Sequence, residues 1–187
     1  MLTQMQAARQ GIITETMRIV AAKENLPAET IRAGVAEGTI AICANPNHKS
    51  LSPSGVGKGL TTKVNANIGT SSSYPDPQPE LLKLAAAIEA GADAVMDLST
   101  GDNIEASRKA IIEASTVMVG TVPIYQATVE AIKKHGAVVD MTKEDLFAVI
   151  EQQAKDGADF MTIHCGINRN VLKALLAEGR VMDVVSR

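Results

Sequence analysis

The stretches EAGADAVMDLS at residues 89–99 and KDGADFMTIHC at residues 155–165 decide the fold of this chain. They begin 66 residues apart, and each runs from a polar helix end through Gly-Ala-Asp into a short apolar run. Glycine suits the left-handed residue that closes a helix, so each stretch is typical of a helix that turns into a buried strand. The similarity of the two stretches therefore predicts a repeated αβ unit.

Similar apolar runs recur along the chain, with helical patterns between them. Apolar residues at spacings of three, four and seven predict a helix through Leu81, Leu84 and Ile88. Strands that alternate with helices build a parallel sheet with right-handed crossovers. The five predicted strands are Lys63–Gly69, Ala92–Ser99, Val117–Pro123, Asp159–Cys165 and Val181–Ser186.

Two parallel architectures fit this order of elements: an open doubly wound sheet and a (β/α)8 barrel. No predicted strand ends in the G-x-G-x-x-G phosphate turn, and polar residues cluster at the strand C-termini, where barrel sites lie. We therefore expect an α/β fold of the (β/α)8 TIM type. A closed barrel takes about 250 residues. Because only five strands are predicted here, we expect the chain to be the front part of a longer protein.

The first 55 residues differ from the rest of the chain. Residues 3–26 predict two helices with a turn at Gly11, and a third short helix is predicted to start near Pro27. Residues 41–60 contain two prolines and three glycines, which predict a loop. We therefore divide the chain into a helical segment with a loop at 1–55 and the first part of the barrel at 56–187.

Composition excludes several classes of partner. The net charge is −3 and aromatic residues make up 2% of the chain, so neither a phosphate-binding groove nor a base-stacking surface is indicated, and we expect no nucleic-acid partner. No apolar run approaches the ~20 residues of a membrane span, so we expect no membrane partner and a cytoplasmic protein. Cys43 and Cys165 are the only cysteines and show no C-x-x-C spacing, which excludes a cysteine-only metal site in this chain.

The residue types and their positions indicate a few candidates for ligand binding. His164 terminates a predicted strand, and its imidazole can donate a hydrogen bond to a ligand near neutral pH. Asn67 and Asn65 share one strand face, and a buried amide there could equally satisfy a neighbouring strand. Tyr125 opens a helix after a strand, where it could also anchor the loop by burial. A methionine such as Met96 is usually core filler.

Three further residues complete this set. Arg187 follows the last predicted strand and suits a bidentate contact to phosphate or carboxylate. His48 and His135 show no metal-ligand spacing, and the position of His135 is typical of a cation at a helix end.

Several strings in order along the chain together resemble the phosphomethylpyrimidine synthase family of radical S-adenosylmethionine enzymes. The resemblance implies a (β/α)8 barrel that binds 5-aminoimidazole ribotide through Asn67, Met96, Tyr125, His164, Ser186 and Arg187; catalytic residues remain unknown. The strings are TQMQAARQGIIT (3–14), NPNH (45–48), KVNANIGTS (63–71), GADAVMDLSTG (91–101), VGTVPIYQA (119–127), DFMTIHCG (159–166) and DVVSR (183–187).

The same resemblance implies the reaction and its cofactors. The family converts the ribotide to 4-amino-2-methyl-5-(phosphomethyl)pyrimidine for thiamine, a lyase reaction that uses S-adenosylmethionine and a [4Fe–4S] cluster. Zinc and cluster ligands in the family's pattern fall beyond Arg187, so no metal or cofactor ligand is assigned in this chain, and we expect the 187 residues alone to be inactive. A homodimer is also implied.

Two other functions stay open at this point. The family's sister enzyme, 5-hydroxybenzimidazole synthase, starts from the same ribotide, although NANIGTS and VPIYQA look more like the thiamine enzyme. The second alternative is a non-catalytic binding or assembly module, which is favoured by the lack of an iron–sulfur cluster motif in this chain.

Overall fold

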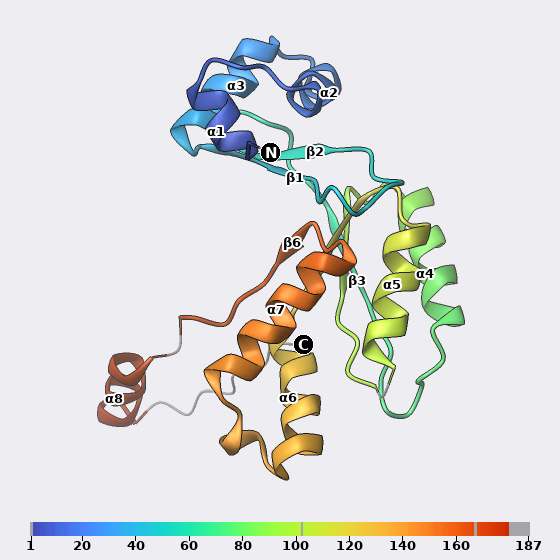
Figure 1. The fold of residues 1–187 in the computed structure, drawn as a ribbon, viewed down its shortest axis with the longest axis vertical. Helices are drawn as coiled ribbons and strands as arrows, with labels where there is room; N and C mark the ends of the chain where they lie inside the picture. Colours follow the sequence, from blue (N-terminus) through green and yellow to red (C-terminus); the bar gives the residue numbers. More distant parts are fainter. Residues whose placement is uncertain (1, 102, 167, 180–187) are drawn as a thin grey trace.

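A computed structural model describes residues 2–101, 103–166 and 168–179 of the chain and shows a helical N-terminal unit beside an α/β unit (Figure 1). The N-terminal helices pack around a buried cluster that includes Met17, Val20 and Ile31. The N-terminal unit consists of α1 (Gln4–Arg9), α2 (Glu15–Glu24), α3 (Ala28–Glu37), β1 (Ile40–Cys43) and β2 (Ser54–Gly57). The three helices and the chain reversal at Gly11 confirm the prediction for residues 3–37.

The prediction of a loop over residues 41–60 is wrong in part. β1 and β2 pair as an antiparallel hairpin, with Ala41 opposite Val56. Glycine and proline depress strand propensity in this segment, but Ile42 and Leu60 pack against the core of the helical unit and hold the hairpin in place. The connection between the two strands, residues 44–53, and the turn at residues 58–60 lie outside the hairpin strands.

The α/β unit is built on a parallel sheet in the order β3-β4-β5-β6, and all three pairs of neighbours are parallel. This confirms four of the five predicted strands, in the predicted order. The fifth, Val181–Ser186, lies outside the described residues, and closure into a (β/α)8 barrel stays a prediction. The strands are β3 (Asn65–Ile68), β4 (Ala94–Asp97), β5 (Met118–Thr121) and β6 (Phe160–Met161).

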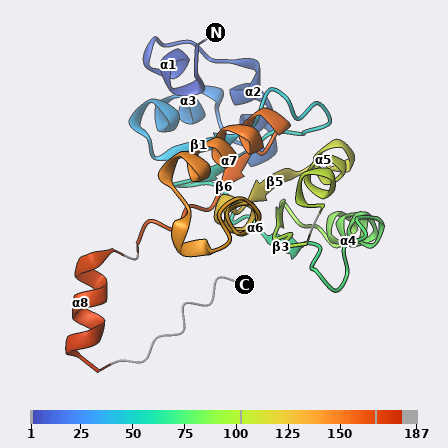
Figure 2. The ribbon, with the colours of Figure 1, turned by 60° about the horizontal axis from the view of Figure 1, so that its bottom comes forward.

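Helices connect these strands, as the periodicity predicts (Figure 2). One face of the sheet buries Ile68, Val95 and Val119 against Leu84 of α4 and Ile111 of α5. The helices are α4 (Gln78–Glu89), α5 (Ile104–Ala114), α6 (Pro123–His135), α7 (Lys143–Asp156) and α8 (Arg169–Ala177), with a 3-10 turn, η1, at Val138–Asp140. Among the described helices, none has the length and apolar character that crossing a bilayer requires.

The repeated Gly-Ala-Asp sequence has the same role at both of its positions. Gly91 and Gly157 take positive φ angles of 90° and 112° where α4 and α7 end. The aspartates that follow accept a backbone N–H at the neighbouring strand: Asp93 from Val64, just before β3, at 2.7 Å, and Asp159 from Val119 of β5 at 2.8 Å. Each repeat therefore ends a helix and ties the start of the next strand to its neighbour.

Gly69 provides a test of how closely the strand ends approach. Its φ is +148°, and a Cβ atom there would lie 2.6 Å from the backbone of Leu98 and Ser99. We expect Gly69→Ala to lower the free energy of unfolding by about 3 kcal/mol, since backbone atoms must move.

Gly91→Ala is the matched control, because Gly91 also has positive φ but a Cβ atom added there would meet nothing within 4 Å. It should cost only the conformational penalty of about 1–2 kcal/mol. Urea unfolding of both variants measures the difference, and equal losses would contradict the close approach at Gly69.

Candidate functional site

The register of the sheet places Asn67 and Met96 side by side. Asn67 pairs with Met96, Met96 with Gly120, and Gly120 with Phe160, so one row of residues crosses all four strands. Because side chains alternate along a strand, this row points away from the face that α4 and α5 cover. Parallel strands end at one edge of the sheet, and the row lies close to that edge.

Two contacts extend the row. Asn65, on the same face as Asn67, donates from Nδ2 to Oδ1 of Asn67 at 2.8 Å. Thr162, which follows β6, lies with its hydroxyl 3.9 Å from the sulfur of half-buried Met96. Sequence reasoning missed Thr162, although in the predicted strand Asp159–Cys165 its spacing of two from His164 would place both residues on one face; in the structure both follow β6.

Tyr125 and His164 form the second pair. Tyr125 lies in the first turn of α6, and His164 follows β6. Their ring centroids are 6.3 Å apart with the planes tilted by 42°. The Tyr125 ring is half-buried, whereas the His164 side chain is exposed, so the imidazole is accessible to a ligand.

Thr162 links the two pairs, since it contacts Met96 and lies two residues before His164. Four of the six predicted site residues therefore belong to neighbouring parallel strands: Asn67 and Met96 lie near the ends of β3 and β4, and Tyr125 and His164 follow β5 and β6. The other two, Ser186 and Arg187, lie outside the described residues.

Buried carboxyl groups hold the strand ends near this edge. Glu80 of α4 is buried and accepts the backbone N–H of Gly69 at 2.6 Å. Asp97 at the end of β4 accepts the backbone N–H of Ser99 at 3.0 Å. Burial raises the pKa of Asp97, although hydrogen bonds from Ser99 and the charge of Arg108 oppose that shift. A cavity of about 310 Å³ opens beside them, lined by Asn67, Ile68, Gly69, Lys83 and Leu98.

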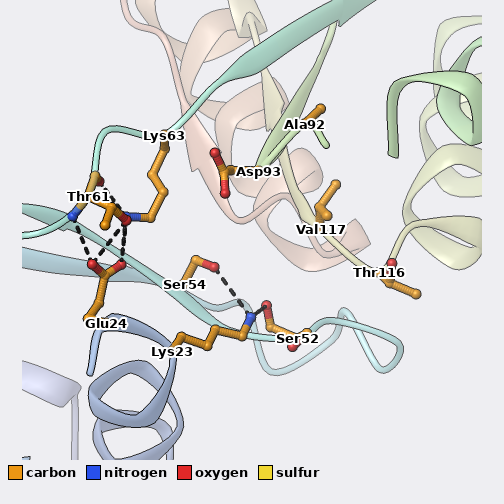
Figure 3. A pocket seen from close by; sticks show the side chains of 10 residues that line it. All are labelled: Lys23, Glu24, Ser52, Ser54, Thr61, Lys63, Ala92, Asp93, Thr116 and Val117. Carbon is orange, nitrogen blue, oxygen red and sulfur yellow. Dashed lines mark hydrogen bonds and ion pairs between the residues drawn. The ribbon is translucent and has the colours of Figure 1, made fainter. Parts of the chain in front are cut away.

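A second cavity, of about 370 Å³, lies at the opposite ends of the strands (Figure 3). Its charged groups are largely engaged within the protein: Lys63 bonds to Glu24 at 2.7 Å, and Lys23 donates to the Ser52 carbonyl at 2.9 Å. Burial lowers the pKa of Lys23. This cavity lies between the helical unit and the sheet, and most of its lining residues are polar. They are Lys23, Glu24, Ser52, Ser54, Thr61, Lys63, Ala92, Asp93, Thr116 and Val117.

His48 and Asp159 form a buried ion pair at that same end of the sheet. The His48 Nδ1 lies 2.7 Å from the Asp159 carboxylate and its Nε2 lies 2.9 Å from the Ser115 carbonyl. Both partners are acceptors, so the ring satisfies them when both nitrogens carry protons. Burial works against the charged ring, but the bonds to Asp159 and Ser115 outweigh it and raise the pKa of His48.

The ion pair fixes the start of β6. Asp159 also accepts the backbone N–H of Asn45 at 2.8 Å, which ties the 44–53 connection to the sheet. His48, which sequence spacing left without a role, thus anchors the start of the strand that precedes His164. Its partner is 111 residues away, so no local pattern could reveal the pair.

A model of the Radical SAM ThiC family matches residues 3–187. The chain belongs to this family. Across 186 residues it is 57% identical to the phosphomethylpyrimidine synthase of Thermoanaerobacter sp. (strain X514) and 55% identical to that of Moorella thermoacetica. It is also 53% identical to a protein named 5-hydroxybenzimidazole synthase BzaB from Moorella thermoacetica. The matches cover all of this chain but only 43% of the two synthases and 44% of the third protein, so the chain spans less than half the length of these relatives.

Membership of the Radical SAM ThiC family implies S-adenosylmethionine and an iron–sulfur cluster. The residues of this chain do not fit a cluster. Cys43 is half-buried in β1, and burial together with the charge of Asp159 raises the pKa of its thiol. Cys165 is exposed beyond β6. Within the described ranges, no three His, Cys, Asp or Glu side chains converge as a metal site.

Reconstitution with iron and sulfide tests this mismatch. Cluster iron is normally held by converging cysteine thiolates, which two separated cysteines do not supply. We expect the 187-residue chain to acquire no stoichiometric [4Fe–4S] absorbance after anaerobic reconstitution and desalting. A Cys43→Ser, Cys165→Ser variant is the control for adventitious iron. Cluster absorbance in the native chain that the variant lacks would contradict the expectation.

The His48 ion pair should appear in the pH dependence of stability. A group whose pKa is raised by folding stabilises the protein fully below its unfolded pKa, and this contribution is lost as pH rises through the folded pKa. We expect His48→Gln to lose about 3 kcal/mol near pH 6, where the native ring is charged, as for a broken buried pair. The loss should shrink as the pH rises above the ordinary histidine value of 6.5.

Urea unfolding over a pH series measures this effect. His164→Gln, at an exposed position after β6, is the control and should stay within about 0.5 kcal/mol of the native chain. A loss at His48 that is constant with pH would contradict a charged ring.

Proposed function

We propose that this chain carries the substrate-binding part of a phosphomethylpyrimidine synthase. In this proposal the whole enzyme converts 5-aminoimidazole ribotide to 4-amino-2-methyl-5-(phosphomethyl)pyrimidine for thiamine synthesis. The observation that supports it most directly is the gathering of Asn67 and Met96, and of Tyr125 and His164, at the C-terminal ends of neighbouring parallel strands. The family match and the relatives named as synthases supply the reaction.

The proposal includes closure of the sheet into a (β/α)8 barrel. In the described residues, β3 and β6 each pair on one side only, which leaves two sheet edges with unpaired backbone groups. Folded proteins avoid such edges, and further strands would pair with them. In a closed barrel, the C-terminal strand ends form the ligand-binding mouth. The proposal also places the enzyme in the cytoplasm as a homodimer.

Each site residue has a binding role suited to its chemistry. The Asn67 amide and the His164 imidazole hydrogen-bond the ribotide, while Met96 supplies an apolar contact beneath it. Tyr125 limits the position of the His164 ring. We assign Ser186 and Arg187 to the phosphate on the basis of side-chain chemistry. S-adenosylmethionine at a [4Fe–4S] cluster would supply the radical chemistry from outside this chain, as would the zinc ligands, and no catalytic residue is assigned here.

A second candidate is 5-hydroxybenzimidazole synthesis. It is favoured by the 53% identity to the protein that bears this name. The two enzymes would share the ribotide and differ in product, so mass spectrometry of the product made by the whole enzyme separates them. A pyrimidine phosphate supports the first proposal, and a hydroxybenzimidazole supports the second.

The ribotide site is tested by substituting its exposed histidine. We expect His164→Ala to weaken ribotide binding or turnover of the whole enzyme by about 10-fold, as for the loss of one hydrogen bond to a charged group. His135→Ala is the control, because His135 lies at the end of α6 and pairs with Asp145 at 3.0 Å. Calorimetric titration and steady-state kinetics provide the two measurements. Equal and small effects of both substitutions would overturn the site.

A further inference from the structure

The hydrogen bond between Asn65 and Asn67 sets which polar group faces a ligand. Asn65 Nδ2 donates to Asn67 Oδ1 at 2.8 Å, so the oxygen of Asn67 is occupied. Across the described part of the chain, Asn67 Nδ2 donates to no protein group. Asn67 is exposed and lines the cavity of about 310 Å³ at the strand ends. With one lone pair of Oδ1 engaged by Asn65, the side-chain polar atom of Asn67 that is left without a partner among the described residues is Nδ2, which offers N–H donors to a ligand.

We propose that Asn65 is a positioning residue that holds the Asn67 amide with its NH2 group toward the substrate. The inference rests on the proposed function, in which Asn67 contacts the ribotide. It adds a specificity rule: the substrate atom that meets Asn67 is a hydrogen-bond acceptor. On this ribotide the acceptors are the unprotonated imidazole nitrogen, the sugar oxygens and the phosphate oxygens.

The backbone gives the amide pair its rigidity. Asn65 and Asn67 pair with Ala94 and Met96 along the β3–β4 ladder, so their Cα positions are fixed on the sheet. Residues two apart on a strand project from the same face, which brings the two amides together. A flipped Asn67 amide would place NH2 against NH2 at this contact, and a flipped pair would present a carbonyl to the ligand instead. The two arrangements thus favour ligand groups of opposite polarity.

Isosteric substitution separates these arrangements. In Asn65→Asp the new carboxylate accepts only, so Asn67 must turn its NH2 toward residue 65 and present its oxygen to the ligand. We expect the whole enzyme with this substitution to bind the ribotide at least about 10-fold more weakly than the native whole enzyme, because a donor is replaced by an acceptor. Asn65→Ala leaves the Asn67 amide free to rotate and should lose only about 3-fold, a fraction of one hydrogen bond.

The added charge of Asn65→Asp needs its own control. Repulsion between this carboxylate and the ribotide phosphate weakens at about 1 M salt, where the screening length is about 3 Å. At this salt concentration, Asn65→Asp should still bind the ribotide more weakly than Asn65→Ala. Titration with the uncharged riboside then locates the acceptor. If Asn65→Asp loses the same fold of affinity for the riboside as for the ribotide, the acceptor lies on the base or sugar. If it loses no affinity for the riboside, the acceptor lies on the phosphate.

The amide orientation is also measured without a ligand. In ¹⁵N spectra of the native chain, we expect one side-chain amide proton of Asn65 to be shifted downfield and to exchange slowly, and this signal should survive Asn67→Asp. The same signal on Asn67 would overturn the inference, as would Asn65→Asp binding at least as well as Asn65→Ala at high salt. Asn67→Ala keeps the two proposals separate, because undiminished ribotide binding by that variant would contradict the proposed function itself.

Discussion

The carboxylate of Asp159 is the group on which the arrangement of this chain most depends. It accepts the His48 ring, the backbone N–H of Asn45 and the backbone N–H of Val119. These three donors come from the 44–53 connection and from β5, and Asp159 itself immediately precedes β6. One buried charge thus joins the helical N-terminal unit to the sheet. Removing its cationic partner would leave a buried anion compensated only by backbone dipoles, which is costly in free energy.

The two ends of the sheet differ in what their polar groups contact. At the N-terminal ends of the strands, polar groups bond mainly to other parts of the protein, as Glu24 does with Thr61 and Lys63. At the C-terminal ends, Asn67 and His164 expose polar atoms to solvent. Parallel α/β proteins separate stability from ligand binding in this same direction. The polarity of the strands therefore indicates where a ligand binds before any relative is considered.

Much of this fold can be predicted from local sequence. The repeated Gly-Ala-Asp predicts the starts of β4 and β6, and Thr142 with Asp145 predicts the capping box that opens α7. The β1–β2 hairpin is not predictable locally, because its stability comes from packing against the helical core and not from the glycine-rich strand itself. The role of His48 is hidden for a similar reason, since its partners lie far along the chain. Long-range contacts, rather than weak propensities, account for both omissions.

The candidate site shows the same division between local and long-range information. Strand polarity and the spacing of two predict that Asn65 and Asn67 share a face, but the direction of their hydrogen bond depends on side-chain rotation. Asn67 lies in β3 and His164 follows β6, the two outer strands of the described sheet, so each borders an open edge. Further strands on those edges would remove water from both groups. A hydrogen bond to a ligand is worth more in such a lower-dielectric site, so closure of the sheet would tighten binding without changing any residue described here.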